Sequence, residues 1–251
     1  MKIGCVGLGN IGRHLAANLI AAGFEVVVHD LNSEAGVPLV AAGATWCDSP
    51  ADVAAVSDAV ITCLPSVKAI TAVVAGERGL ADGFRPGGTW IDMSTNDRHE
   101  LLRLAAMLGE RGVSTLEAPV TGGAHNASSA TITVLVGGDE AVFERYRSVF
   151  NALGGRVFFL GELGQAAVIK VITNMLAFIH IAATAEAYML AARAGIDLRQ
   201  AWEVIKASSG NSFIHETEST TILSGSYDIG FSLDLSCKDL GFALQLGREL
   251  D

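Results

Sequence analysis

Lys170 is the residue whose chemistry most needs an explanation. It lies in the apolar segment VIKVITNM, positions 168–175, and it is the only charged residue between Glu162 and Glu186. An ammonium group is costly to bury unless it is paired, neutralised or used in a reaction. Burial would favour the neutral amine, which could accept a proton from an alcohol or return one to a carbonyl oxygen. The alternative is a lysine with a buried stem and its head in water.

Asn174 lies four residues after Lys170. In a helix this spacing places the two side chains one turn apart on the same face. An ammonium and a carboxamide that point in one direction could act on one small polar molecule. Lys170 and Asn174 are therefore the candidate catalytic residues.

A glycine motif lies near the amino terminus, at Gly7-Leu8-Gly9-Asn10-Ile11-Gly12. It directly follows a strand-like run and opens a helix-like one, the context in which G-x-G-x-x-G predicts a dinucleotide-binding loop. Gly7 permits the tight turn, Gly9 lets the backbone approach a pyrophosphate, and Gly12 allows close packing of helix on strand. A glycine turn that binds nothing is the alternative.

Asp30 follows the second strand-like run. An acidic residue at this place bonds the adenosine ribose hydroxyls of NAD, whereas the 2′-phosphate of NADP would require a nearby cation. No lysine or arginine occurs between Arg13 and Lys68, so the sequence predicts NAD rather than NADP. An ordinary turn former at a strand end is the alternative for Asp30.

Two later segments also follow predicted strands, CLPS at positions 63–66 and DMST at positions 92–95. Ligands of open α/β sheets lie at the carboxyl ends of the strands. These loops can therefore flank the nicotinamide half of a dinucleotide, although each loop alone could be a simple turn. The candidates are Leu64, Pro65, Ser94 and Thr95.

The segment EAPVTGG, positions 117–123, follows another predicted strand. Thr121 offers a hydroxyl, and the amides of Gly122 and Gly123 can be approached closely, a combination suited to a small carboxylate. A hairpin-type connection is the alternative.

These candidate residues require strands and helices that place them together. The first part of the chain alternates short β-branched runs with amphipathic ones, which predicts a parallel sheet covered by helices. From residue 165 onward only helical periodicity remains. We therefore predict an α/β fold, with a Rossmann-type doubly wound domain at 1–162 and an all-helical domain at 163–251. Strands are predicted at 2–6, 25–29, 59–64, 89–93, 114–117, 131–136 and 157–160, and helices at 11–22, after Ser49-Pro50, and at 140–153, 165–194 and 198–207.

The charge and the cysteines exclude several classes of protein. The 17 basic and 27 acidic residues give a formal net charge of −10, which opposes binding to nucleic-acid phosphates. The four cysteines form no C-x-x-C pair, as is typical of reduced thiols in a cytoplasmic protein. The six histidines show no paired ligand spacing, so we expect no metal site.

Membrane segments are not expected either. The first residues enter the strand and glycine motif at once, which leaves no room for a signal peptide. The most apolar window, residues 166–185, is interrupted by Lys170, Asn174 and His180. It falls short of the roughly 20 consecutive apolar residues that span a bilayer.

The order of the motifs resembles the β-hydroxyacid dehydrogenase family over essentially the whole chain. GLGNIG looks like the cofactor motif of that family, EAPVTGG like its substrate loop with Thr121 in place of the usual serine, and GELGQAAVIKVITNM like its catalytic segment. CKDL, at positions 237–240, looks like its late K-D-L motif. The resemblance implies an NAD-dependent oxidoreductase that interconverts a short 3-hydroxy acid and its semialdehyde.

By that resemblance, Lys170 is the catalytic lysine and Asn174 orients the substrate. Substrate carboxylate would meet Thr121, Gly122 and Gly123. The resemblance also implies a homodimer or homotetramer. Ser94 and Thr95 would contact the nicotinamide ribose side, and Lys238 together with Phe231 would close over the cleft.

The chain departs from the family pattern in three places. Ala130 stands where a glycine is common, and the distance from Gly164-Gln165 to Lys170 matches the semialdehyde-reductase branch. Because the family continues with further helices, we expect a helical domain that is truncated at its carboxyl end.

Two other functions remain open, a catalytically silent dinucleotide-binding or assembly module and an imine reductase on the same fold.

Overall fold

The computed structural model describes residues 1–226 and 230–250, which form two compact units, Met1–Lys170 and Val171–Asp251. The predicted domain boundary, between residues 162 and 163, lies before the long helix rather than inside it. Residues 227–229 and 251 of the predicted second domain lie outside the described residues. The roles assigned to the two domains stay predictions.

The first unit is built on a nine-stranded sheet with the order β3-β2-β1-β4-β5-β6-β8-β7, and β9 pairs with β8. The pairings from β3 to β6 are parallel, and β8 runs antiparallel to β6. Sequence order reverses between β1 and β4, where doubly wound sheets bind their ligands. The strands are β1 Lys2–Val6, β2 Glu25–His29, β3 Thr45–Trp46, β4 Ala59–Thr62, β5 Thr89–Asp92, β6 Ser114–Glu117, β7 Val120–Thr121, β8 Ile132–Gly138 and β9 Gly154–Phe159.

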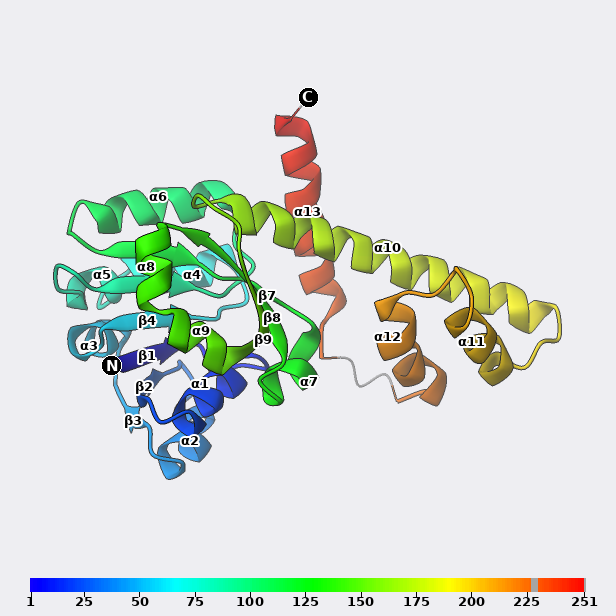
Figure 1. Cartoon of the computed structure of the whole chain (residues 1–251), viewed down its shortest axis with the longest axis horizontal. Coiled ribbons are helices and arrows are strands. Elements are labelled where there is room, and N and C mark those ends of the chain that lie inside the picture. The colour runs from blue at the N-terminus through cyan, green and yellow to red at the C-terminus, as the bar shows by residue number, and fades with distance from the viewer. Residues whose placement is uncertain (227–229, 251) are drawn as a thin grey trace. The chain divides into compact units, whose positions relative to one another are not determined.

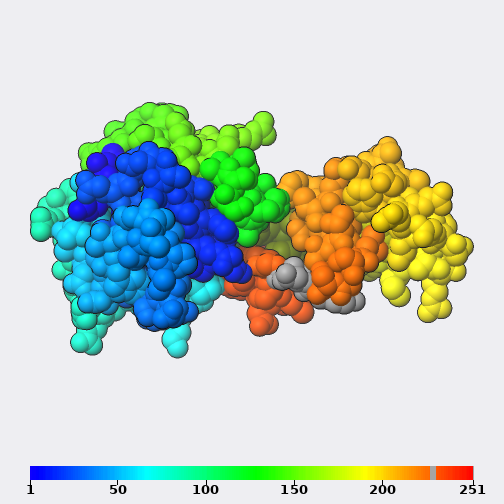
Figure 2. Space-filling view, turned by 90° about the horizontal axis from the view of Figure 1, so that it is seen from below, coloured from blue at the N-terminus to red at the C-terminus, as the bar shows by residue number. Residues whose placement is uncertain are grey.

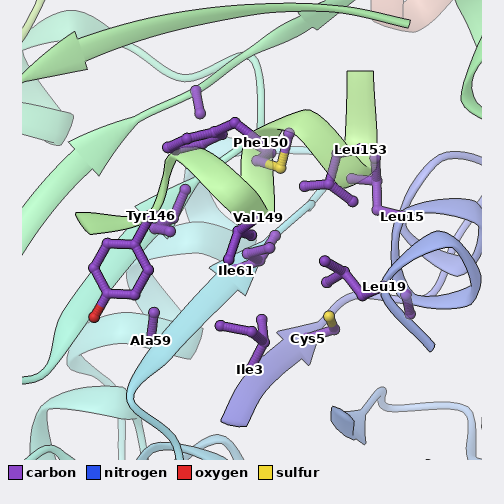
Figure 3. Packing of buried hydrophobic residues seen from close by; sticks show 14 of the residues in the cluster. Ile3, Cys5, Leu15, Leu19, Ala59, Ile61, Tyr146, Val149, Phe150 and Leu153 are labelled. Atoms are coloured by element: carbon purple, nitrogen blue, oxygen red, sulfur yellow. The ribbon is translucent and has the colours of Figure 1, made fainter. Parts of the chain in front are cut away.

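Helices cover both faces of this sheet. Because neighbouring residues of a strand point to opposite faces, Ala59 and Ile61 of β4 join one core cluster and Val60 joins the other. On the first face, Leu15 and Leu19 of α1 and Phe150 of α9 pack against the strands (Figures 1 and 3). The helices are α1 Gly12–Ala21, η1 Ser33–Gly36, α2 Val37–Ala41, α3 Pro50–Val56, α4 Val67–Ala75, α5 Leu80–Gly83, α6 Arg98–Gly109, α7 Gly123–Ser128, α8 Glu140–Arg145 and α9 Arg147–Leu153.

Several elements differ from the predictions. The helix predicted over 140–153 is two helices, α8 and α9, that meet at Tyr146, whose hydroxyl donates to the Asp58 carbonyl oxygen at 3.0 Å. Strand β7 pairs antiparallel with β8, and helix α7, which was not predicted, lies in the connection between them. Helix α7 lies beside α1, where Asn18 Nδ2 donates to the Ala127 carbonyl oxygen at 2.8 Å (Figure 2).

The second unit consists of helices in the residues that the structure describes. Its inner contacts centre on His215, which is fully buried. The Tyr188 hydroxyl lies 3.2 Å from His215 Nδ1, and the Trp202 carbonyl oxygen lies 3.1 Å from His215 Nε2. These contacts join three of its helices. The helices are α10 Gln165–Arg193, whose residues 165–170 belong to the first unit, α11 Leu198–Lys206, α12 Phe213–Ser224 and α13 Leu233–Glu249.

Helix α10 is long and apolar enough, by length and composition, to cross a membrane, with a mean hydropathy of 1.8 in its most apolar window. We expected Lys170, Asn174 and His180 to prevent this. Core helices of soluble proteins meet the same criteria, and 28% of the window is buried in this single chain. The absence of a membrane contact and the cytoplasmic location therefore stay predictions.

Candidate active site

The glycine motif forms the turn between β1 and α1. Gly7 has a φ of +93°, a conformation that glycine adopts without strain. Its amide donates to the His29 carbonyl oxygen at 3.1 Å, which ties the turn to β2. Helix α1 begins at Gly12, and the amides of its next residues donate to carbonyl oxygens of the turn itself. The positive end of the helix dipole lies at this turn and favours an anion.

The three glycines of the motif have different surroundings. A Cβ at Gly7 would lie 2.5 Å from the Cys63 carbonyl oxygen, and one at Gly12 would lie 1.9 Å from the Gly7 carbonyl oxygen. A Cβ at Gly9 would meet no atom within 4 Å, and Gly9 is exposed. Gly7 and Gly12 are thus required by the protein's own packing, whereas Gly9 leaves open the space that a pyrophosphate would use. Asn10 lies beside that space in the same turn and is also exposed.

Asp30 is held directly against the glycine turn. Its Oδ2 accepts a hydrogen bond from the Leu8 amide at 2.7 Å, and its Oδ1 accepts one from the Asn32 amide at 2.8 Å. The carboxylate is therefore fixed at the carboxyl end of β2, where ribose hydroxyls would lie in a dinucleotide complex.

Leu64 and Ser94 connect the loops that follow β4 and β5. The Leu64 amide donates to Ser94 Oγ at 3.0 Å, and the Leu64 side chain lies 2.8 Å from where a Cβ at Gly7 would stand. Pro65, the next residue, is exposed. The glycine turn and these two loops therefore form one continuous edge of the sheet.

Asp92, at the end of β5, organises this edge from inside. Its Oδ1 accepts from Thr62 Oγ1 at 2.9 Å and from the Ser94 amide at 3.1 Å, and its Oδ2 accepts from Asn96 Nδ2 at 2.9 Å. Trp90 Nε1 donates to Thr62 Oγ1 in turn, at 2.9 Å. One buried carboxylate thus orients the loop that carries Ser94.

A small pocket lies at the carboxyl ends of β5 and β6, and Lys170 is part of its wall. Lys170 is 7% exposed, so the alternative of a lysine with its head in water does not hold in this chain. The pocket brings Lys170 together with two predicted residues, Ser94 and Thr95. Its lining consists of Asp92, Ser94, Thr95, Asn96, Leu101, Glu117, Pro119, Ala167 and Lys170.

Two carboxyl groups, those of Asp92 and Glu117, share the pocket wall with Lys170. Burial raises the pKa of Asp92 above its ordinary value, against the lowering effect of its hydrogen bonds from Ser94, Thr62 and Asn96. Burial also raises the pKa of Glu117, and the negative charge of Asp92 adds to the rise, while backbone N–H groups oppose it. Buried groups with perturbed pKa values that meet in a pocket are typical of active sites.

The predicted carboxylate-binding residues lie next to this pocket along the chain, but they do not line it. The pocket wall includes Pro119, two residues before Thr121. Gly122 and Gly123 have φ angles of +120° and +81° and start helix α7. The role of Thr121, Gly122 and Gly123 in binding a carboxylate therefore stays a prediction.

Asn174 belongs to the second unit and is 8% exposed. Its Nδ2 donates to Asp239 Oδ2 at 2.6 Å, and Lys238 Nζ lies 3.2 Å from Asp239 Oδ1. The structure thus joins Asn174 to the K-D-L motif, two features that are far apart in the sequence. Phe231 stacks on Phe178, with ring centroids 5.7 Å apart.

The predicted site missed three buried acids: Asp92, Glu117 and Asp239. Asp92 and Glu117 each end a buried strand, and this position was a usable signal because a carboxylate is rarely buried without a purpose. Asp239 is the acid of the K-D-L motif, and that resemblance was the signal that the sequence held for it. No group of three or more His, Cys, Asp or Glu residues that could hold a metal ion occurs in the described part of the chain.

Two family models match the chain. Residues 2–161 match the NAD binding domain of 6-phosphogluconate dehydrogenase, and residues 164–251 match the NAD-binding domain of NADP-dependent 3-hydroxyisobutyrate dehydrogenase. The chain is 35% identical over 250 residues to 2-(hydroxymethyl)glutarate dehydrogenase of Eubacterium barkeri, and the match covers 99% of this chain and 83% of that relative. It is also 35% identical over 250 residues to L-threonate dehydrogenase of Escherichia coli, with the same coverage of both.

A comparison with solved structures indicates the same family. The crystal structure of 3-hydroxyisobutyrate dehydrogenase from Salmonella typhimurium superposes with a TM-score of 0.92 at 33% identity, covering 100% of this chain and 88% of that one. The predicted Rossmann-type domain followed by helices is confirmed. The chain is an oxidoreductase that uses a nicotinamide dinucleotide, and neither the silent module nor the imine reductase is favoured. From its motifs, its fold and these relatives, the chain belongs to the β-hydroxyacid dehydrogenase family.

Proposed function

We propose that the protein oxidises a short 3-hydroxy acid to its semialdehyde with NAD, and that Lys170 accepts the hydroxyl proton. The observation that carries the proposal is the burial of Lys170 in a pocket formed by the loops that follow β5 and β6. A lysine in that place is near the edge where the dinucleotide-binding turn also lies. Its amine is the basic group that oxidation of an alcohol requires.

The residues of the first unit fit a dinucleotide. Open space above Gly9 and the positive end of the α1 dipole suit a pyrophosphate, while Asp30 suits the adenosine ribose. A dinucleotide held there would supply the hydride acceptor that oxidation of the substrate alcohol requires. The protein binds the two molecules, excludes water and moves the proton.

The substrate is proposed to be a small acid with a hydroxyl group on the third carbon. The relatives are named for 2-(hydroxymethyl)glutarate, threonate and 3-hydroxyisobutyrate, all of which combine a carboxylate with a nearby hydroxyl. Thr121 and the amides of Gly122 and Gly123 would hold the carboxylate. In the second unit, the Asn174 amide donates to Asp239, and Asn174 is the second residue that we propose to bind the substrate.

NAD is proposed over NADP because the Asp30 carboxylate would repel a 2′-phosphate. The surrounding sequence offers no compensating lysine or arginine between Arg13 and Lys68. Replacing Asp30 by Ser should weaken NAD binding by about tenfold and reduce the preference over NADP, since a bidentate acceptor of ribose hydroxyls is lost. Titration of both reduced cofactors by fluorescence measures the ratio. Equal affinities in the unmodified protein would contradict the assignment.

The proton-transfer role of Lys170 is tested with Lys170→Met, which keeps the aliphatic length and removes the amine. We expect kcat to fall by about 10²-fold or more, the usual contribution of a general base, with NAD affinity retained. Lys68→Ala, at an exposed lysine of α4, is the matched control and should leave kcat unchanged. Oxidation of 3-hydroxyisobutyrate, 3-hydroxypropionate, glycerate and serine is followed by NADH absorbance. A Lys170→Met protein with the original kcat would refute the role.

We further propose that the protein forms a homodimer or homotetramer through the apolar face of α10. Ile172, Leu176 and Ile179 are 37%, 46% and 52% exposed in the single chain, and their spacing places them on one side of the helix. Exposed apolar patches of this kind are typical of protein interfaces. Light scattering should give a multiple of the chain mass of 26.1 kDa, and Ile179→Glu should lower it. A monomer at micromolar concentration would contradict the proposal.

A further inference from the structure

Glu117 makes a set of contacts that the proposed reaction does not yet use. It ends β6 and is 2% exposed. Its Oε1 accepts hydrogen bonds from the amides of Gly164 and Ala166, the latter at 2.9 Å, and its Oε2 accepts one from the Ala167 amide at 2.8 Å. A single carboxylate therefore satisfies three backbone donors at the start of α10, a helix end that would otherwise leave them unpaired.

The Glu117 carboxylate fills the space beside β8 that a side chain at position 137 would otherwise occupy. Gly137 of β8 pairs with Glu117 across the sheet, and a Cβ at Gly137 would lie 2.4 Å from Glu117 Oε1. Any larger residue at position 137 would displace the carboxylate. The Gln165 amide, the remaining donor of that turn, bonds the Glu162 carbonyl oxygen at 3.2 Å. The first turn of α10 is thus completely paired, and most of the pairing depends on Glu117.

Glu117 also lies between the two parts of the proposed site. The chain that follows it, from Pro119 to Gly123, is the proposed carboxylate-binding loop, and the helix turn that it holds leads directly to Lys170. Glu117, Pro119 and Lys170 all line the same pocket. A shift at the start of α10 would move Lys170 relative to the loop, and small displacements of a reacting group strongly reduce rates.

We propose that Glu117 is a positioning residue, whose carboxylate fixes the first turn of α10 to the end of β6 and thereby holds Lys170 in place relative to the substrate loop. This inference rests on the proposed function for its effect on turnover. The anchor itself is a structural property and can be tested without turnover.

The experiment compares the unmodified protein with Glu117→Gln, which keeps the side-chain length but replaces one acceptor oxygen by an NH₂ donor facing an amide. Hydrogen exchange of the peptide that spans residues 164–170 should become about tenfold faster or more, because a charged acceptor of helix amides is lost. With a hydroxy-acid substrate, kcat should fall by about tenfold or more. Affinity for NAD, which binds to the β1–α1 turn, should change by less than about twofold.

Two further variants separate positioning from general destabilisation. Asp139→Asn weakens a similar contact, because Asp139 Oδ1 accepts from the Val142 amide at 3.0 Å at the start of α8, outside the pocket. It should leave both kcat and exchange at 164–170 unchanged. Glu117→Asp keeps the charge on a side chain one methylene shorter, so it should restore part of kcat relative to Glu117→Gln.

Two results would overturn the proposal. One is that Glu117→Gln changes neither the exchange of residues 164–170 nor kcat. The other is that Asp139→Asn loses as much kcat as Glu117→Gln. If Glu117→Gln does not fold, the same comparison is made with Glu117→Asp: faster exchange with lower kcat supports the anchor, and unchanged values refute it. If the unmodified protein oxidises no hydroxy acid, the proposed function fails, and the exchange rates alone decide whether Glu117 anchors α10.

Discussion

Two alanine substitutions in the glycine motif should change different properties. Gly12→Ala should lower the stability of the protein, whereas Gly9→Ala should weaken its binding of the dinucleotide. A Cβ at Gly12 would lie 1.9 Å from the Gly7 carbonyl oxygen, and a Cβ at Gly9 would meet nothing within 4 Å. Overpacking of this severity costs about 1–3 kcal/mol or more. At about 2–4 °C per kcal/mol for a unit of this size, Gly12→Ala should lower Tm by roughly 2–12 °C.

Gly9→Ala should leave the empty protein intact and weaken the complex. Because Gly9 does not adopt a positive φ, alanine can replace it there and should keep Tm or raise it slightly, by restricting the unfolded chain. Its methyl group would occupy the place of the pyrophosphate. Loss of about 1.4 kcal/mol, a tenfold weaker Kd for NADH, is the least that we expect.

The assay pairs calorimetry with fluorescence titration of NADH. Gly109→Ala is the matched control, because Gly109 ends α6 and a Cβ there also meets nothing within 4 Å. It should change neither Tm nor Kd appreciably. The reasoning is refuted if Gly9→Ala binds NADH as tightly as the unmodified protein, or if Gly12→Ala melts at the original temperature.

Two further predictions concern buried ionisable groups. Burial raises the pKa of Asp92 above its ordinary value of 3.8, so the folded state holds this proton more tightly than the unfolded state does, and the contribution of Asp92 to stability falls as pH rises from about 4 through its folded pKa. The Tm of the unmodified protein minus that of Asp92→Asn should decrease over that range, and a constant difference would contradict the assignment. Burial raises the pKa of Cys5 to about 12, so a thiol reagent at pH 8 should modify the exposed Cys237 first and reach the buried Cys5 only after denaturation. Rapid modification of Cys5 in the native protein would contradict this order.

The parallel sheet could be predicted because its strands are short runs that contain β-branched residues, set between amphipathic ones. The predicted strand at 2–6 matches β1, that at 25–29 matches β2, and that at 114–117 matches β6. Helices α4 and α6 were not predicted, although Ser66 and Asp97 are ordinary N-cap residues that bond the amides of Ala69 and Glu100. Their core faces are narrow stripes inside mixed sequence, and such stripes are harder to recognise than a run of valines.

The candidate site divides in the same way between local and long-range information. The glycine motif and Lys170 are visible in the sequence because each contrasts with its neighbours, as glycines in a tight turn or as one charge in an apolar run. Glu117 and Asp92 are visible only as acids at the ends of strands, and their importance comes from partners about 30 to 50 residues away, as Ala167 is for Glu117 and Thr62 for Asp92.

This difference has a physical origin. A side chain that meets a cofactor or substrate must differ chemically from its surroundings, so its residue type alone suggests a role. A side chain that positions another needs only a charge or an acceptor at the right place, and many residues have one. Whether Glu117 positions Lys170 depends on where the strand end and the helix start meet, a relation that the fold sets and that no short segment of this sequence contains.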